Sequence, residues 1–184
     1  MLYYLVALFN KDSYDLIKPM QKSLSSEYKL YKNLPMLHIT LAVIEDPDMD
    51  KLNKILSDTL KDYKEFEVHL NGVICFGGDC KSVNLKVDEE SGSIKSISRI
   101  IHKRLCEEGF TLTSNPDTWQ LHVSLANPYF AQRVWGEDEF ESACIKLKNY
   151  GFNRELLIDH IQFWRPINDE SKMVVFDYPL KPMI

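Results

Sequence analysis

The 184-residue sequence has few glycines and cysteines, no excess of positive charge and no long apolar run. It has 22 lysines and arginines against 27 acidic residues, a net charge of −5, which argues against a protein that binds long nucleic acid. No apolar stretch approaches the roughly 18 residues that a membrane span needs. The apolar start, residues 1–9, lacks a basic n-region and a small-residue cleavage site, so we expect a buried strand rather than a signal peptide.

The four cysteines are few for a disulfide scaffold of this length. We therefore expect reduced thiols and a cytoplasmic protein. Cys75 and Cys80 flank the pair Gly77-Gly78, which allows either a zinc site or a hairpin turn. Since two further ligands with metal spacing are missing from the sequence, the turn is favoured. The glycine pair also lacks the Lys-Ser/Thr of a phosphate-binding loop.

Strand and helix patterns alternate along the chain, which is typical of an α+β protein with mainly antiparallel sheets. Apolar patterns predict strands at 1–9, 36–44, 66–76, 82–87, 119–126, 156–164 and 172–178, and helices at 12–29, 46–60, 94–106 and 137–150. Pro19 does not fit a helix interior, so it is expected in a first turn or at a kink. The order strand, helix, strand, strand occurs twice without a linker between the copies. The sequence thus predicts a single domain, 1–184, of two packed lobes.

One six-residue segment occurs twice. Residues 37–42 read LHITLA and residues 121–126 read LHVSLA, with four identical positions and two conservative ones. Because side chains alternate along a strand, the three apolar residues of each copy share one face, while the histidine, the hydroxyl residue and the alanine share the other. Histidine and hydroxyl then lie about 7 Å apart along the strand. The alanine beyond them is expected to leave room for a ligand.

Either copy alone is typical of a half-buried strand with a satisfied histidine, but two copies in matching strands indicate a site. Two imidazoles can supply a neutral base and a protonated acid near neutrality. The hydroxyls of Thr40 and Ser124 can donate to the non-bridging oxygens of a phosphate. No cluster of acidic metal ligands accompanies the pair in the sequence. The pattern therefore indicates metal-independent phosphodiester cleavage, with His38 and His122 as base and acid in either order.

On His38-Ile39-Thr40 and His122-Val123-Ser124, the sequence resembles the 2H phosphoesterases, which include the LigT-like 2′-5′ RNA ligases and cyclic nucleotide phosphodiesterases. The resemblance spans nearly the whole chain. It implies a bilobal α+β fold with pseudo-twofold symmetry, in which two mainly antiparallel sheets face a central cleft and the helices lie outside. It also implies the two histidines as the catalytic pair and Thr40 and Ser124 as the phosphate-binding hydroxyls, without metal or cofactor. The implied bonds are 2′,3′-cyclic phosphates, 2′-5′ linkages or related cyclic phosphodiesters.

Further candidate substrate-binding residues are Arg133, Tyr129, Phe130 and Tyr3. RNA-directed members of the family often carry an arginine three residues after the second motif, where this chain has Asn127; Arg133 is a candidate to contact the phosphate instead. Tyr129 and Phe130 follow the second motif and could either stack on a nucleobase or pack on the adjacent lobe. Tyr3 is a candidate to reach the cleft from the first strand.

The expected substrate is a small nucleotide or a short RNA end, with no long duplex and no membrane as partner, and a monomer is the default expectation. Two other interpretations stay open. One is a binding module of the same fold that holds a nucleotide or RNA end without turnover, and the other is an interaction domain whose duplication is only structural. Two histidines close enough to flank one phosphate would favour the enzyme, and histidines on separate surfaces would exclude it.

Overall fold

The computed structural model of the protein describes residues 1–88 and 92–184. Its elements are β1 (Leu2–Phe9), α1 (Lys11–Tyr28), β2 (Ile39–Glu45), α2 (Met49–Leu60), β3 (Phe66–Phe76), β4 (Ser82–Val87), α3 (Ser93–Glu107), β5 (Thr111–Leu112), β6 (His122–Ala126), α4 (Glu137–Tyr150), β7 (Asn153–Trp164), α5 (Glu170–Met173) and β8 (Val174–Pro179). The α+β class predicted from the sequence is confirmed. Among the described residues, no helix is both long and apolar enough to cross a membrane.

Most elements lie where the sequence predicts them, and β3, β4 and α4 have the predicted bounds. The two motif strands begin later than predicted, at Ile39 and His122 instead of 36 and 119. Pro19 lies inside α1 on its exposed side, so the expected first-turn position is wrong, and the kink stays a prediction. The short elements β5 and α5 were not predicted, because two to four residues carry too little periodicity to recognise.

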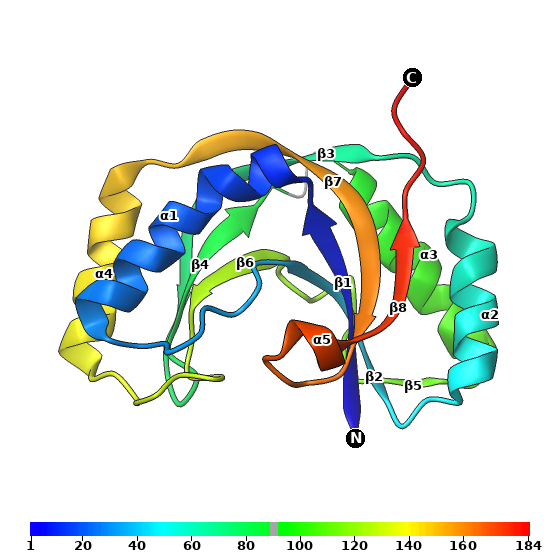
Figure 1. The fold of residues 1–184 in the computed structure, drawn as a ribbon, viewed down its shortest axis with the longest axis horizontal. Helices are drawn as coiled ribbons and strands as arrows, with labels where there is room; N and C mark the ends of the chain where they lie inside the picture. The colour runs from blue at the N-terminus through cyan, green and yellow to red at the C-terminus, as the bar shows by residue number, and fades with distance from the viewer. Residues whose placement is uncertain (89–91) are drawn as a thin grey trace.

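The strands form one hydrogen-bonded sheet with the order β1-β2-β6-β4-β3-β7-β8, and β7 also pairs with β1. The first part of β7, residues 153–158, pairs with β3, and the second part, residues 158–164, pairs with β1. In Figure 1, β7 bends over the molecule from the side of α4 to the side of β8. This one long strand therefore joins the two sheets expected from the sequence into a continuous sheet.

The strand order is symmetric about the contact between β2 and β6. On one side follow β2, β1 and the second part of β7, which we call the first half; on the other follow β6, β4 and β3, which we call the second half. Each half takes strands from both parts of the chain: β1 lies beside the late strand β7, and β6 lies beside the early strand β4. The repeat in the sequence therefore does not coincide with the two structural halves.

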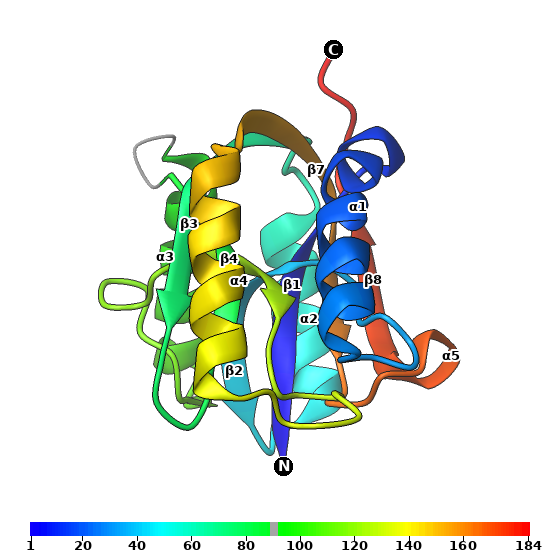
Figure 2. The same ribbon diagram turned by 90° about the vertical axis from the view of Figure 1, so that its left-hand side faces the viewer.

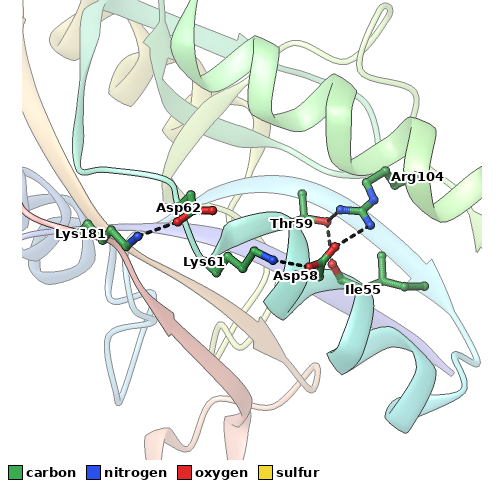
Figure 3. Close-up of polar contacts among 7 residues, drawn as sticks. All are labelled: Ile55, Asp58, Thr59, Lys61, Asp62, Arg104 and Lys181. Atoms are coloured by element: carbon green, nitrogen blue, oxygen red, sulfur yellow. Dashed lines mark hydrogen bonds and ion pairs between the residues drawn. The ribbon is translucent and has the colours of Figure 1, made fainter.

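Helices α1 and α4 lie on one side of the molecule, and α2 and α3 lie on the other (Figure 1). Turned by 90°, the structure shows α1 and α4 in front of the strands (Figure 2), and Lys146 of α4 forms an ion pair with Glu27 of α1. On the opposite side, Arg104 of α3 donates to Thr59 Oγ1 at 2.8 Å and to Asp58 Oδ2 at 3.0 Å, both on α2 (Figure 3). Apolar side chains from these four helices and the sheet form one core cluster.

One expectation about the cysteines is wrong. Cys75 of β3 and Cys144 of α4 form a disulfide, with their Cα atoms 6.3 Å apart, instead of remaining reduced. Helix α4 packs against β3 and presents Cys144 from its buried side. The two residues are distant in sequence, so only the packing of helix on strand brings them together. Cys80 and Cys106 are free thiols, and both are exposed.

Candidate active site

The two repeated motifs meet at the centre of the sheet. Strands β2 and β6 are antiparallel and pair at Ile39 and Val123, the middle residue of each motif. Continued by one residue in each direction, this register sets His38 beside Ser124 and Thr40 beside His122. The two imidazoles are then diagonal neighbours on the same face, a relation that puts their backbones about 7–8 Å apart. This arrangement places both histidines on one face of the sheet, on neighbouring strands.

A β-bulge follows each motif. On β2, Thr40 pairs with Val6 but Ala42 pairs with Leu5, so Leu41 is the extra residue. On β6, Ser124 pairs with Asn84 but Ala126 pairs with Val83. Each bulge reverses the alternation of side chains, so both alanines join the hydrophobic core at 1% exposure. The expectation that Ala42 and Ala126 leave room beside the ligand is therefore wrong.

Both histidine rings are held in the same way. Nδ1 of His38 lies 2.7 Å from the carbonyl oxygen of Met36, and Nδ1 of His122 lies 2.8 Å from that of Gln120. A carbonyl oxygen can only accept, so Nδ1 carries the hydrogen in each neutral ring. Nε2 of each ring is then left with a lone pair for proton transfer. These bonds use the carbonyls of residues that the sequence assigned to the strands, which accounts for the later starts of β2 and β6.

An aromatic ring packs against each histidine edge-on. Trp164 of β7 lies with its ring centroid 4.7 Å from that of His38, and Phe76 of β3 lies 5.2 Å from His122. The two aromatic residues occupy corresponding strands of the two halves. One strand separates each of them from its motif strand, β1 in the first half and β4 in the second. Together with the carbonyl acceptors, they limit the orientation of each imidazole and exclude water from one side of it.

Burial lowers the pKa of both imidazoles. The pKa of His38 falls to about 4, because the charged ring would lose its water and because His122 would repel it, although the Met36 carbonyl partly offsets this. The pKa of His122 is also lowered by burial, against the opposing effect of the Gln120 carbonyl. The interaction between the rings places both in one electrostatic environment. Burial thus favours the neutral form of both rings, and a bound anion beside one of them would favour its protonated form.

The two motif hydroxyls have different surroundings. Ser124 Oγ donates to Asn84 Oδ1 at 2.8 Å and accepts from Asn127 Nδ2 at 2.9 Å. The Thr40 hydroxyl makes no side-chain hydrogen bond to any residue that the structure describes. Thr40 is therefore free to donate to a ligand, whereas the hydroxyl hydrogen of Ser124 is already used in its bond to Asn84.

Tyr3 points away from the histidines. It pairs with Ile44, stacks on Phe163 at 5.4 Å and packs against the main core. Its neighbour Tyr4 pairs instead with Trp164, so Tyr4 is the first-strand tyrosine on the histidine face. The expectation that Tyr3 reaches the site is therefore corrected by one position, because alternation sends successive side chains to opposite faces.

Arg133 has protein partners for its guanidinium. It donates to the backbone carbonyl of Tyr28 and makes two contacts with Glu139, at 2.9 and 2.6 Å. This arginine holds the pKa of the Glu139 carboxyl at about 2. Arg133 thus connects the loop after β6 to α1 and α4, and it offers no free fork to a phosphate in this structure.

Tyr129 and Phe130 lie exposed on the loop after β6, at 63% and 50% exposure. The hydroxyl of Tyr31 anchors the start of this loop, since it donates to the carbonyl of Asn127 at 2.7 Å and accepts from its N–H at 2.8 Å. A hydrogen bond with Cys80 raises the pKa of Tyr129. Neither aromatic ring packs on the adjacent lobe as a buried residue would, so the stacking interpretation stays a prediction.

Four residues of the site were not predicted from the sequence: Trp164, Phe76, Asn84 and Lys86. Asn84 and Lys86 interrupt the apolar strand β4, and a fully buried asparagine in such a strand is a signal that could have been noticed. Lys86 pairs with His122, so its exposed side chain starts on the histidine face. No group of three or more potential metal ligands occurs among the described residues.

The chain is similar to known proteins in sequence and in fold. The sequence matches the 2′-5′ RNA ligase superfamily over residues 11–170, and no curated protein matches it. The fold is similar to that of E. coli LigT complexed with NADP+, with a TM-score of 0.60, 10% identity and coverage of 97% of this chain and 96% of that chain. It is also similar to TT0787 of Thermus thermophilus (TM-score 0.57, 12% identity, 100% of each chain). Usb1 of Kluyveromyces marxianus with uridine monophosphate gives a TM-score of 0.50 at 14% identity, covering 97% of this chain and 98% of that chain.

Proposed function

Because the chain belongs to the 2′-5′ RNA ligase superfamily, a group of 2H phosphoesterases, we propose that it cleaves phosphodiester bonds by acid–base catalysis between His38 and His122. The substrates are 2′,3′-cyclic phosphates or 2′-5′ phosphodiesters at RNA ends or in small nucleotides. The observation that carries the proposal is the pair of imidazoles on one sheet face, each with Nδ1 bonded to a carbonyl and Nε2 left for proton transfer.

The reaction needs two proton transfers. The neutral Nε2 of one histidine accepts a proton from water as the water oxygen bonds to phosphorus. The bond from phosphorus to the leaving ribose oxygen breaks, and Nε2–H of the other histidine, now an imidazolium, gives its proton to that oxygen. The products are a phosphomonoester and a free hydroxyl, and the two histidines have exchanged protonation states. The negative charge of the bound phosphate raises the pKa of the adjacent imidazole and so supplies the acid that the free protein lacks.

A small substrate agrees with two further observations. The net charge of −5 disfavours a long polyanion but leaves a local contact to one phosphate possible. Two of the similar solved structures hold small nucleotides, NADP+ in LigT and uridine monophosphate in Usb1. Lys86 supplies a positive charge beside His122, where a single phosphate could bind.

A non-catalytic binding module of the same fold is the second candidate. The observation that favours it is the lowered pKa of both histidines, since two neutral imidazoles can accept hydrogen bonds from a ligand but provide no acid. The binding module and the enzyme use the same surface and differ only in turnover.

Product analysis by chromatography separates these two functions. The panel contains nucleoside 2′,3′-cyclic phosphates, 2′-5′ dinucleotides, 3′-5′ dinucleotides and ADP-ribose 1″,2″-cyclic phosphate, each with excess chelator. We expect turnover of one class, lost in His38→Ala and in His122→Ala but kept in His102→Ala, which alters a histidine of helix α3 outside the site. Binding without turnover across the panel would replace the enzyme with the binding module.

A further inference from the structure

The strands that flank the two motifs differ in chemistry. Beside Thr40 on β1 lies Val6, and the register of β1 with β2 brings Leu8 next to His38. At the corresponding places of the second half, Asn84 pairs with Ser124 and Lys86 pairs with His122. The first half thus surrounds its motif with apolar side chains, and the second half provides an amide and an ammonium.

The orientation of the Asn84 amide follows from its contacts. Asn84 is fully buried, and its Nδ2 donates to the carbonyl of Ile74 at 3.1 Å and to Oγ of Ser82 at 3.1 Å. Only acceptors or hydroxyls surround this nitrogen, so Oδ1 is the atom that faces Ser124. Since Oδ1 can only accept, Ser124 must donate its hydroxyl hydrogen to it.

Asn127 completes the arrangement around Ser124. Its Nδ2 donates to Ser124 Oγ at 2.9 Å, so this oxygen accepts one hydrogen bond and gives one away. A phosphate oxygen is an acceptor and needs a donor. Ser124 could donate to it only by leaving Oδ1 of the fully buried Asn84 without a partner, which is costly. The Thr40 hydroxyl has no such commitment within the described residues.

We propose that Asn84 is a positioning residue that makes the active site one-sided: by holding the Ser124 hydroxyl hydrogen, it leaves Thr40 as the hydroxyl that donates to the substrate phosphate. The inference rests on the proposed function and adds the orientation of the substrate to it. The anionic oxygens then lie toward Thr40 and its cross-strand neighbour His122, where Lys86 also contributes positive charge. The leaving ribose oxygen then lies within reach of His122 Nε2, and the attacking water and the apolar side of the substrate lie toward His38.

This orientation assigns the roles of the two histidines. His122, next to the anionic oxygens, gains a proton on binding and acts as the general acid, whereas His38 remains neutral and acts as the general base. The burial of His38 against Trp164 agrees with this assignment, because it favours the neutral ring. Steady-state kinetics on a panel substrate that the wild type hydrolyses can test which hydroxyl, that of Thr40 or that of Ser124, donates to the phosphate.

The first test compares two hydroxyl deletions. Thr40→Val keeps the shape of the side chain and removes the donor, and we expect kcat to fall about 10²–10³-fold, as for loss of a donor to transition-state charge. Ser124→Ala should lower kcat less than about 10-fold, because its hydroxyl does not reach the substrate. Equal losses in the two variants would overturn the inference. Thermal unfolding of both variants verifies that each is folded when assayed.

The second test gives both hydroxyls the same kind of neighbour. Asn84→Val places a valine beside Ser124, as Val6 lies beside Thr40, and frees the Ser124 hydroxyl. A 2′,3′-cyclic phosphate can then bind in both orientations. Wild type is expected to release one phosphomonoester isomer, Asn84→Val a mixture of the 2′ and 3′ isomers, and Asn84→Val/Ser124→Ala one isomer again. A purely structural role for Asn84 would lower activity without altering the isomer ratio, and that result would contradict the proposal. If Asn84→Val does not fold, the comparison of Thr40 and Ser124 decides.

A binding experiment separates failure of this inference from failure of the proposed function. Titration with inorganic phosphate requires no turnover. Thr40→Val should weaken phosphate binding about 10-fold or more, and Ser124→Ala should leave it nearly unchanged. If wild type hydrolyses nothing but this difference is found, the proposed function fails and the orientation stands. Equal weakening in both variants contradicts the orientation, whatever the outcome of the hydrolysis assays.

Discussion

The two halves of the candidate active site share a backbone design and differ in the strands beside it. Each half has a histidine bonded through Nδ1 to a carbonyl, a hydroxyl two residues on, a bulge after it and an aromatic ring against the imidazole. Beside these shared features, β1 presents Val6 and Leu8, and β4 presents Asn84 and Lys86. Symmetric motifs therefore do not imply symmetric chemistry, because side chains on neighbouring strands set the solvation and hydrogen bonding of each histidine and hydroxyl.

The largest effect should separate the base from the acid. His38→Ala and His122→Ala should each lower the rate on a ribose leaving group by about 10²–10⁴-fold. On a p-nitrophenyl phosphodiester, whose leaving group needs no proton, His122→Ala should lose far less and His38→Ala should lose as much as before. The measurement is kcat/KM on both substrates for the two variants and wild type. The reverse pattern would exchange the roles, and equal losses on both substrates would leave the halves chemically equivalent.

The second half is tied by a covalent bond, and the first half is not. Reduction of the Cys75–Cys144 disulfide should lower the free energy of unfolding by about 2–4 kcal/mol, because the open chain gains conformational freedom in the unfolded state. Urea unfolding with and without a phosphine reductant measures this difference. Cys75→Ala/Cys144→Ala should be insensitive to reductant, and Cys80→Ser/Cys106→Ser should respond as wild type does. A wild-type protein indifferent to the reductant would contradict the expectation.

Burial of His38 should make stability depend on pH. The pKa of His38 is about 4 in the folded protein and near 6.5 when the chain is unfolded, so the unfolded state binds more protons between these values. The contribution is present above pH 6.5 and is lost as the pH falls to about 4, by roughly 1–3 kcal/mol. Urea unfolding from pH 7 to pH 4, compared with His38→Gln, isolates this contribution from that of other groups. Parallel curves for the two proteins would refute it.

The smallest effect concerns the contact between helices α2 and α3. The contacts of Arg104 with Asp58 and Thr59 join α3 to α2 near the surface (Figure 3), and Lys61 also pairs with Asp58 at 2.7 Å. Such exposed ion pairs contribute little, so Arg104→Met should lower stability by about 0.2–1 kcal/mol. Chemical unfolding at low and high salt measures it, and the difference should shrink with salt. A loss of unfolding free energy as large as that caused by reducing the disulfide would contradict this expectation.

Local patterns in the sequence predicted the elements that have strong periodicity or clear ends. Strands β3 and β4 and helix α4 have the predicted bounds, since a glycine turn and helix-ending Gly151 mark their limits. The starts of β2 and β6 were misplaced because the Met36 and Gln120 carbonyls bond to imidazoles, a contact that an apolar pattern does not reveal. Alternation also failed at Ala42 and Ala126, because a bulge adds one residue to a strand without changing its composition.

The sequence by itself determined the class of the fold and the chemical groups of the candidate site. The repeated His-x-Thr/Ser segments placed an imidazole and a hydroxyl on one face of each strand, because alternation is a local property of extended backbone. Only the tertiary structure decided which strands flank the motifs, and so that Asn84 lies beside Ser124, Val6 beside Thr40 and Cys75 beside Cys144. Those neighbours are distant in the chain, and strand pairing and helix packing, rather than any local preference, bring them into contact.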